Sequence, residues 1–128
     1  MASRPRLSAA ELDIARVLWS LGRATVRQVH DALPRDRPLE FPTVQTYLRR
    51  LEFKGYAKAE LEGRVLVYTP SVRKTDVVRR TVDDLLQNLF DGEALPLVRH
   101  LVERRRVSRK DLDELRKLID KSEESSHD

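Results

Sequence analysis

The stretch "FPTVQTYLRRLEFKGY", residues 41–56, decides the fold. Its apolar positions Val44, Leu48 and Leu51 recur at the spacing of one buried helical face. A proline near the start and Gly55 near the end are typical of the two ends of a helix. We therefore expect a helix that buries one face against other elements and turns a polar face away from them.

The polar face of this helix carries Gln45, Thr46 and Arg49, with Thr43 and Arg50 on its flanks. Arginine binds guanine through two hydrogen bonds, glutamine pairs with adenine, and threonine contacts thymine methyl groups. A helix about 10–12 Å across also fits the major groove of B-DNA. Simple exposure to solvent produces a polar face as well, so the position of the helix in the chain has to decide between the two interpretations.

Two helix starts precede this stretch, and each has the pattern of a capping box. In "LSAAELD" the N-cap is Ser8 and its partner is Glu11; in "TVRQVHD" the corresponding pair is Thr25 and Gln28. A glycine ends the first helix and a proline ends the second. The stretch at residues 41–56 is therefore the third helix.

After the third helix the pattern becomes that of a β-hairpin. The run "YAKAELEGRVLVYTP" contains two strand-like segments separated by Glu62 and Gly63. Three helices followed by a hairpin is the order of a winged helix-turn-helix, and we assign residues 1–70 to such a DNA-binding domain. Base contacts are then expected from Thr43, Gln45, Thr46, Arg49 and Arg50.

Three further side chains are candidates for contacts with the DNA backbone. Lys58 and Arg64 lie on the expected hairpin, where they would reach phosphates on either side of the groove. Thr25 lies at a helix N-terminus, whose N–H groups bind phosphate. Its role as an N-cap explains Thr25 equally well.

Residues 71–128 have helical periodicity and no strand signal. Three successive apolar stripes of this length cannot form a globule alone, so we expect a helical dimerisation region that pairs with a second copy of the chain. Packing of these helices back onto the N-terminal domain of a monomer is the alternative. The expected interface comprises Val78, Val82, Leu85, Leu86, Leu89, Leu101, Leu112, Leu115, Leu118 and Ile119. Ser108 and Asp111 form a capping box for the last helix, and the acidic residues from Ser122 onward are expected to fray.

The expected fold class is thus mainly α with a small β-hairpin. The chain has 128 residues, a formal net charge of +4 and no cysteine. Absence of cysteine excludes disulfides, thiolate zinc sites and cysteine nucleophiles, and we expect no metal and no cofactor. No apolar run is long enough to span a membrane and no secretory signal begins the chain, so we expect a cytoplasmic protein. Seven acidic and three basic side chains fall in residues 111–128, which leaves the rest of the chain basic and suited to a polyanion.

Two functions from other classes were weighed against DNA binding. For an enzyme, the three histidines His30, His100 and His127 are scattered, and no phosphate-binding loop or catalytic carboxylate spacing is found. For a winged-helix adaptor, the third helix would bind a protein instead of a duplex. We therefore expect a homodimeric, sequence-specific repressor on a dyad-symmetric DNA operator, with the adaptor as the alternative.

The chain also resembles the penicillinase-repressor family of bacterial regulators, which includes repressors of β-lactamase and methicillin-resistance genes and copper-responsive repressors. The resemblance rests on the pattern T-V-x-T-x-L-x-R-L-x-x-K-G at residues 43–55 and on the ending "LVRHLVERRRVSRKDLDELRKLI". It implies a dimeric repressor of palindromic operators. It also implies DNA-contacting roles for Thr43, Gln45, Thr46 and Arg50.

The resemblance bears on induction too. Members that respond to β-lactams are cleaved between an asparagine and a phenylalanine, and the matching pair here is His100 and Leu101. A regulatory protease is thus an expected partner only if it accepts this different pair. The copper-responsive members use a cysteine metal motif, which a chain without cysteine cannot provide.

Overall fold

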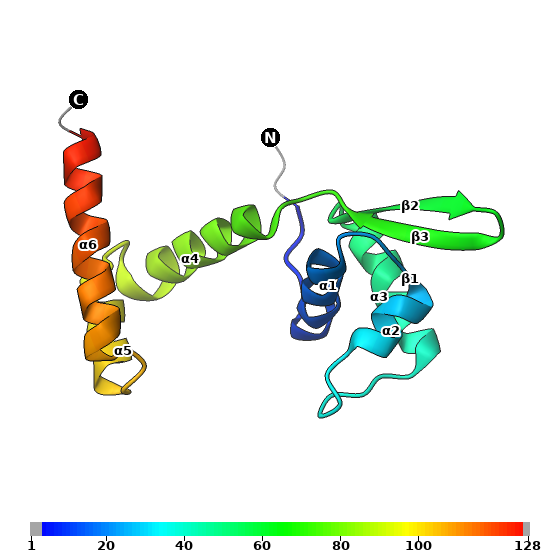
Figure 1. Ribbon diagram of the computed structural model, residues 1–128, viewed down its shortest axis with the longest axis horizontal. Helices are drawn as coiled ribbons and strands as arrows, with labels where there is room; N and C mark the ends of the chain where they lie inside the picture. Colours follow the sequence, from blue (N-terminus) through cyan, green and yellow to red (C-terminus); the bar gives the residue numbers. More distant parts are fainter. Residues whose placement is uncertain (1–3, 127–128) are drawn as a thin grey trace. The chain divides into compact units, whose positions relative to one another are not determined.

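The computed structural model describes residues 4–126, which separate into two compact units. The first unit extends to Arg79 and the second begins at Arg80, within the fourth helix. The first unit holds three helices and a small sheet, and the second is helical (Figure 1). In chain order the elements are α1 (Ala9–Leu21), β1 (Ala24–Thr25), α2 (Val26–Ala32), α3 (Phe41–Phe53), β2 (Ala57–Glu62), β3 (Val65–Pro70), α4 (Lys74–Phe90), α5 (Leu95–Glu103) and α6 (Arg109–Ser126).

The capping box predicted for α1 is confirmed. The Glu11 backbone N–H donates to the Ser8 hydroxyl at 3.1 Å, and the Ser8 backbone N–H donates to the Glu11 carboxylate at 2.7 Å. Gly22 ends the helix, and its N–H donates to the Leu18 carbonyl at 2.8 Å. The helix packs against α2, α3 and β3, so it is an interior element of the first unit.

The capping box of α2 is confirmed in the same way. The Gln28 N–H donates to the Thr25 hydroxyl at 3.1 Å, and the Thr25 N–H donates to the Gln28 side chain at 2.9 Å. The helix ends at Ala32 because Leu33 is extended. A residue that precedes a proline, as Leu33 precedes Pro34, is biased towards that conformation.

The third helix begins at Phe41 and has Pro42 in its first turn, where a missing N–H leaves no helical bond unmade. Its end is closed by Gly55, which has a φ of 88°. The Tyr56 N–H then donates back to the Leu51 carbonyl at 2.8 Å, as in a Schellman motif. The predicted role of Gly55 at the end of this helix is confirmed.

The predicted hairpin is present, but it belongs to a three-stranded antiparallel sheet in the order β1-β3-β2. The two strands of the hairpin pair as far as Glu62↔Val65, so the turn consists of Gly63 and Arg64 and not of the predicted Glu62 and Gly63. Gly63 has a φ of 63°, and tight hairpin turns place such a residue at the first central position.

The short strand β1 was not predicted. It pairs Ala24 with Tyr68 and Thr25 with Val67. Two residues carry no periodic signal. The strand forms because the N-cap of α2, Thr25, is extended, which lets the chain lie alongside β3 before the helix starts.

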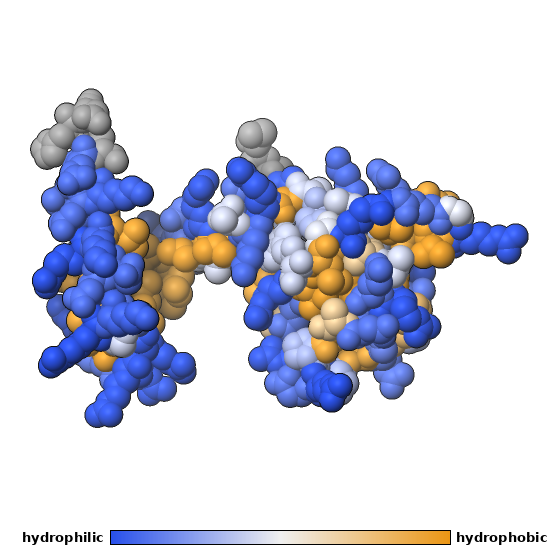
Figure 2. Space-filling view, in the orientation of Figure 1, coloured by the Kyte–Doolittle hydropathy of each residue, from blue (hydrophilic) through white to orange (hydrophobic). Residues whose placement is uncertain are grey.

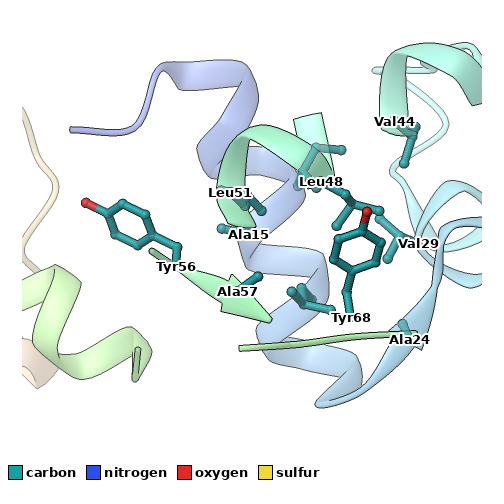
Figure 3. Packing of buried hydrophobic residues seen from close by; sticks show 11 residues of the cluster. Ala15, Ala24, Val29, Val44, Leu48, Leu51, Tyr56, Ala57 and Tyr68 are labelled. Carbon is teal, nitrogen blue, oxygen red and sulfur yellow. The ribbon is translucent and has the colours of Figure 1, made fainter. Parts of the chain in front are cut away.

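The core of the first unit lies between the helices and one face of the sheet. Ile14, Val29 and Leu48 are fully buried, one from each helix, and Tyr68 contributes from β3. Figure 3 shows the Tyr68 ring beside Leu48 and Val29. The indole N–H of Trp19 donates to the Val72 carbonyl at 2.9 Å and so ties α1 to the segment that follows the sheet.

The second unit begins within α4 and continues through α5 and α6. The capping box at the start of α6 is confirmed: the Asp111 N–H donates to the Ser108 hydroxyl at 3.1 Å, and the Ser108 N–H donates to the Asp111 carboxylate at 2.9 Å. The helix continues to Ser126, past Ser122, where fraying was predicted. No glycine or proline interrupts this end, and its lysine and glutamates favour helix. Residues 127 and 128 of the predicted tail lie outside the described residues.

The predicted fold class is confirmed: the chain is mainly helical, and its first unit has the helix order and hairpin of a winged helix-turn-helix. None of the helices described between residues 4 and 126 has the length and apolar character needed to cross a membrane.

Candidate nucleic-acid interface

The two faces of α3 differ as the sequence predicted. Val44, Leu48 and Leu51 are fully buried, on the side that packs against α1 and α2. Thr46 and Arg49 are exposed on the opposite side. Packing of its buried side thus fixes the position of the helix, and its other side presents hydrogen-bonding side chains. A helix that contacts the edges of DNA bases requires this arrangement.

Thr43 and Gln45 are half-buried, whereas Arg50 is exposed. At about 100° per residue, Gln45 lies only about a quarter-turn from the buried Val44. It therefore lies at the edge of the outward face, beside the buried residues and not opposite them as the sequence predicted. The centre of the face lies at Thr46, about 160° around the helix from Val44 and Leu48.

The Thr46 side chain is oriented by its own helix. Its hydroxyl donates to the Pro42 carbonyl at 3.0 Å. That carbonyl lies one turn earlier, so the bond is of the back-bonding kind that serine and threonine form in helices. The hydroxyl oxygen keeps its lone pairs as acceptors, and the rotamer of the side chain is set before any ligand arrives.

Two arginines at this surface lie over aromatic rings. The Arg50 guanidinium lies 5.4 Å from the centroid of the Tyr47 ring, one turn of α3 away. The Arg27 guanidinium, from α2, lies 5.0 Å from the centroid of the Phe41 ring at the start of α3. Both distances are within the range of cation–π attraction. Arg27 and its ring were not among the residues predicted from the sequence, because only the fold brings α2 beside the start of α3.

The three candidates for backbone contacts occupy different elements. Thr25 is half-buried at the N-terminus of α2. Lys58 is exposed on β2, where the sheet pleat turns it away from the face that carries Ala57. Arg64 is exposed in the turn of the hairpin. These positions lie on three different elements, and no hydrogen bond or ion pair among them is found in the described chain.

Phe53, the last residue of α3, is 91% exposed. It follows Thr46 by seven residues and Arg49 by four, so it belongs to the same outward row. Phe53 was not among the predicted contact residues, because those were all hydrogen-bonding types. The helical wheel that selected Thr46 would also have found Phe53.

A buried ion pair anchors the C-terminal end of α3. The Lys54 ammonium donates to the Glu11 carboxylate at 2.6 Å and to the Arg6 carbonyl at 3.0 Å. Glu11 is 2% exposed. Burial by itself would raise the pKa of Glu11, but the hydrogen bonds from Lys54 and Ser8 and the positive charge of Lys54 outweigh it and lower the pKa below 4.5. The pair therefore joins the start of α1 to the end of α3 with the carboxylate ionised.

The buried side of α3 also lies beside the buried hydroxyl of Tyr68. Burial raises the pKa of Tyr68, the negative charge of Glu52 raises it further, and the positive charge of Arg49 acts in the opposite direction. Tyr68 is thus a neutral hydroxyl at physiological pH.

The predicted interface residues of the helical region are poorly covered within one chain. Of the side chains described from Arg80 to Glu124, none is buried. Figure 2 shows hydrophobic residues exposed along these helices. Leu86 and Leu101 are half-buried, and the others are 37–71% exposed: Val78, Val82, Leu85, Leu89, Leu112, Leu115, Leu118 and Ile119.

The candidate cleavage pair lies inside α5. His100 is exposed and Leu101 is half-buried. The Arg104 N–H donates to the His100 carbonyl at 2.9 Å, and the Arg106 N–H donates to the Leu101 carbonyl at 2.8 Å. A protease that binds its substrate as an extended strand would therefore require local opening of this helix.

The histidines, the hollow beside α1 and the acidic side chains form less suitable sites for a ligand. His30 lies 3.2 Å from Asp31 and edge-on to the Phe41 ring, at 6.0 Å between centroids, and His127 lies outside the described residues. A hollow of about 490 Å³ beside α1 is rimmed by the exposed ion pair between Asp13 and Arg37. Among residues 4–126 no group of three His, Asp or Glu side chains is arranged to hold a metal ion.

Comparisons with known proteins agree with this geometry. A family model described as "Penicillinase repressor" matches residues 7–121. The penicillinase repressor of Bacillus licheniformis is 28% identical over 120 residues, which cover 94% of each chain. The solution structure of the DNA-binding domain of the repressor BlaI is 36% identical, with a TM-score of 0.52, over 59% of this chain and 93% of that one. The monomeric form of B. licheniformis BlaI in complex with the blaP half-operator matches the same shares at 36% identity and a TM-score of 0.50.

Proposed function

The chain belongs to the penicillinase repressor family, and from this premise we propose that it is a sequence-specific, DNA-binding transcriptional repressor that acts as a homodimer on a dyad-symmetric operator. The observation that carries the proposal is the outward face of α3. Thr46, Arg49 and Arg50 are exposed, and the residues on the opposite side of the helix are fully buried. The unit is similar to a domain that binds a half-operator.

In this proposal α3 enters the major groove and reads base edges. Thr46 and Arg49 contact bases from the centre of the helix face, Arg50 from one flank, and Thr43 and Gln45 from its edges. Thr25, Lys58 and Arg64 contact phosphates and set the register, as does the newly found Arg27, which Phe41 holds at the N-terminal end of the helix.

Dimerisation is supported by the exposure of the helical region. A helical segment without a buried side chain in its own chain has no core to stabilise it. A second copy would cover the stripe formed by α4, α5 and α6. We therefore assign residues 1–70 to DNA binding and 71–128 to dimerisation, with two α3 helices placed about 34 Å apart, or a multiple of that distance, on the operator.

The mechanism of repression is occlusion of a promoter by the bound dimer. Events that separate the two copies release the DNA, because one copy holds only one half-site. The protein would act in the cytoplasm, where bacterial chromosomal DNA lies, and without catalysis. A regulatory protease that cuts between His100 and Leu101 would separate the DNA-binding unit from α6.

The proposal is tested by selecting bound duplexes from a random-sequence library with the full-length protein. The expected result is an enriched inverted repeat, bound more tightly than a scrambled duplex, with an affinity that falls linearly on a log–log plot as salt rises. A protein adaptor would enrich no sequence and show no dependence of binding on salt. That outcome would contradict the proposal.

A further inference from the structure

The outward row of α3 ends on an apolar side chain. Thr46, Arg49 and Phe53 are spaced three and four residues apart, so they follow one another along the same side of the helix. At a rise of about 1.5 Å per residue, Phe53 lies about 10 Å beyond Thr46 along the axis. Three base pairs of B-DNA occupy about the same length.

Two arginines and one carboxylate, that of the exposed Glu52, lie close to Phe53 along α3. Arg49 and Arg50 lie one turn before it and are exposed. An apolar peptide that docked on the ring would have to remove water from these two guanidinium groups, which is costly, and a second copy would have to place carboxylates against both of them. A duplex offers acceptors on its base edges to the arginines and a thymine methyl group to the ring. The position of Phe53 in the row of Thr46 and Arg49 therefore favours nucleic acid as the molecule that covers it.

We propose that Phe53 reads a thymine of the operator half-site by packing its ring against the 5-methyl group. That methyl group is the apolar feature of the base edges in the major groove, and phenylalanine is one of the side chains suited to it. The ring has no donor or acceptor for the polar edges of guanine, cytosine and adenine. The inference rests on the proposed function and adds a specificity determinant about three base pairs from the base beside Thr46.

The experiment removes the methyl group from the DNA and the ring from the protein. After an operator has been selected with the full-length protein, each thymine in turn is replaced by deoxyuridine in both half-sites, which deletes only the methyl group. Affinities of the wild type and of Phe53→Ala are then measured on every duplex at one salt concentration. Leu21→Ala serves as the control, because Leu21 is a 44% exposed apolar residue on α1 of the same unit.

One thymine per half-site should respond. Its replacement weakens wild-type binding about fourfold per half-site, and about fifteenfold for the dimer, whereas Phe53→Ala binds the two duplexes equally. Phe53→Leu, which keeps an apolar side chain, retains part of the discrimination. Leu21→Ala behaves as the wild type, and Phe53→Ala melts at the wild-type temperature because the ring is exposed.

Three results would overturn the inference in distinguishable ways. If the wild type selects no sequence, the proposed function fails and the role of Phe53 fails with it. If an operator is selected but Phe53→Ala binds it as tightly as the wild type, only the role of Phe53 fails. If Phe53→Ala weakens binding but still discriminates between thymine and deoxyuridine at every position, the ring contacts the sugar–phosphate backbone and reads no base.

Discussion

At the scale of single residues, the proposed role of α3 depends on side chains that hold the helix in place as well as on those that face outward. The Lys54–Glu11 pair fastens the end of α3 to the start of α1, and Glu11 has two roles because it also completes the α1 capping box. The capping box could be predicted from four consecutive residues. The ion pair could not, since its partners are 43 positions apart and only the packing of α1 on α3 brings them together.

The ionised state of Glu11 predicts a specific dependence of stability on pH. Its pKa in the folded chain lies below 4.5, so the stability that it contributes is present above that pH and is lost as the pH falls through the lowered pKa. Glu11→Gln should therefore lower the free energy of unfolding at pH 7 by about 2 kcal/mol, the scale of a lost hydrogen bond to a charged group. This difference should shrink as the pH falls through the lowered pKa of Glu11.

Urea unfolding of the two proteins between pH 3 and pH 7 measures this difference. Asp13→Asn is the control, because the ion pair of Asp13 with Arg37 is at the surface and contributes little. Parallel pH profiles for the wild type and Glu11→Gln would show that the carboxylate does not bear charge-dependent stability.

The outward residues show the same limit of sequence reasoning. The helical wheel located Val44, Leu48 and Leu51 on one side, and the buried side of α3 followed from them. The spacing could not say how far the neighbouring elements reach around the helix, so Gln45 was grouped with Thr46 and Arg49 on the outward face although it is half-buried. Phe53 lies on the predicted outward side, but it was overlooked because its side chain forms no hydrogen bonds.

At the scale of elements, the helices could be predicted better than the strands. Each of α1, α2 and α6 begins at a capping box that is visible in the sequence. The hairpin was predicted as well, but its turn was placed one residue too early, because a two-residue turn around Gly63 can include the residue on either side of it. The two residues of β1 are defined by pairing with β3, which is a long-range property.

The hairpin should contribute affinity and not specificity. If Arg64 binds a phosphate, Arg64→Ala reduces the slope of log affinity against log salt by about 0.9 for each phosphate that is no longer neutralised, or about 1.8 for a dimer. The ratio of operator to scrambled-DNA affinity should stay unchanged. Fluorescence anisotropy over a series of salt concentrations provides both quantities, and Arg16→Ala on α1 is the matched control. An unchanged slope would remove Arg64 from the interface.

The α4 stripe should determine the oligomeric state. Leu85→Asp places a charge within the predicted seam, so the protein should sediment as a 14.9 kDa monomer. Its affinity for the whole operator should be as low as the affinity of one copy for a single half-site. Gln87→Asp introduces the same charge on the exposed opposite side of α4 and should leave a dimer. Sedimentation equilibrium that finds Leu85→Asp still dimeric would move the interface to another surface.

At the scale of the whole molecule, the two units differ in how many of their apolar side chains they bury within one chain. The first unit has a continuous core that includes Ile14, Leu18 and Tyr68, so it can hold α3 rigidly without help. From Arg80 to Glu124 the described chain has no buried side chain, and in our proposal a second copy covers its apolar stripes. Composition indicated a basic body and an acidic end, but only the three-dimensional structure separates the part that is complete from the part that is not.

The central claim is that the outward face of α3 reads DNA sequence. Its most direct test is the ratio of the affinity for the operator to the affinity for a scrambled duplex. Operator and scrambled-duplex affinities are measured for the wild type and for the double variant Thr46→Ala with Arg49→Ala, together with the melting temperature of each protein. The account predicts that the ratio falls by about ten- to a hundredfold per half-site, while the melting temperature and the affinity for scrambled DNA change little. A double variant that melts normally and keeps the wild-type ratio would contradict it.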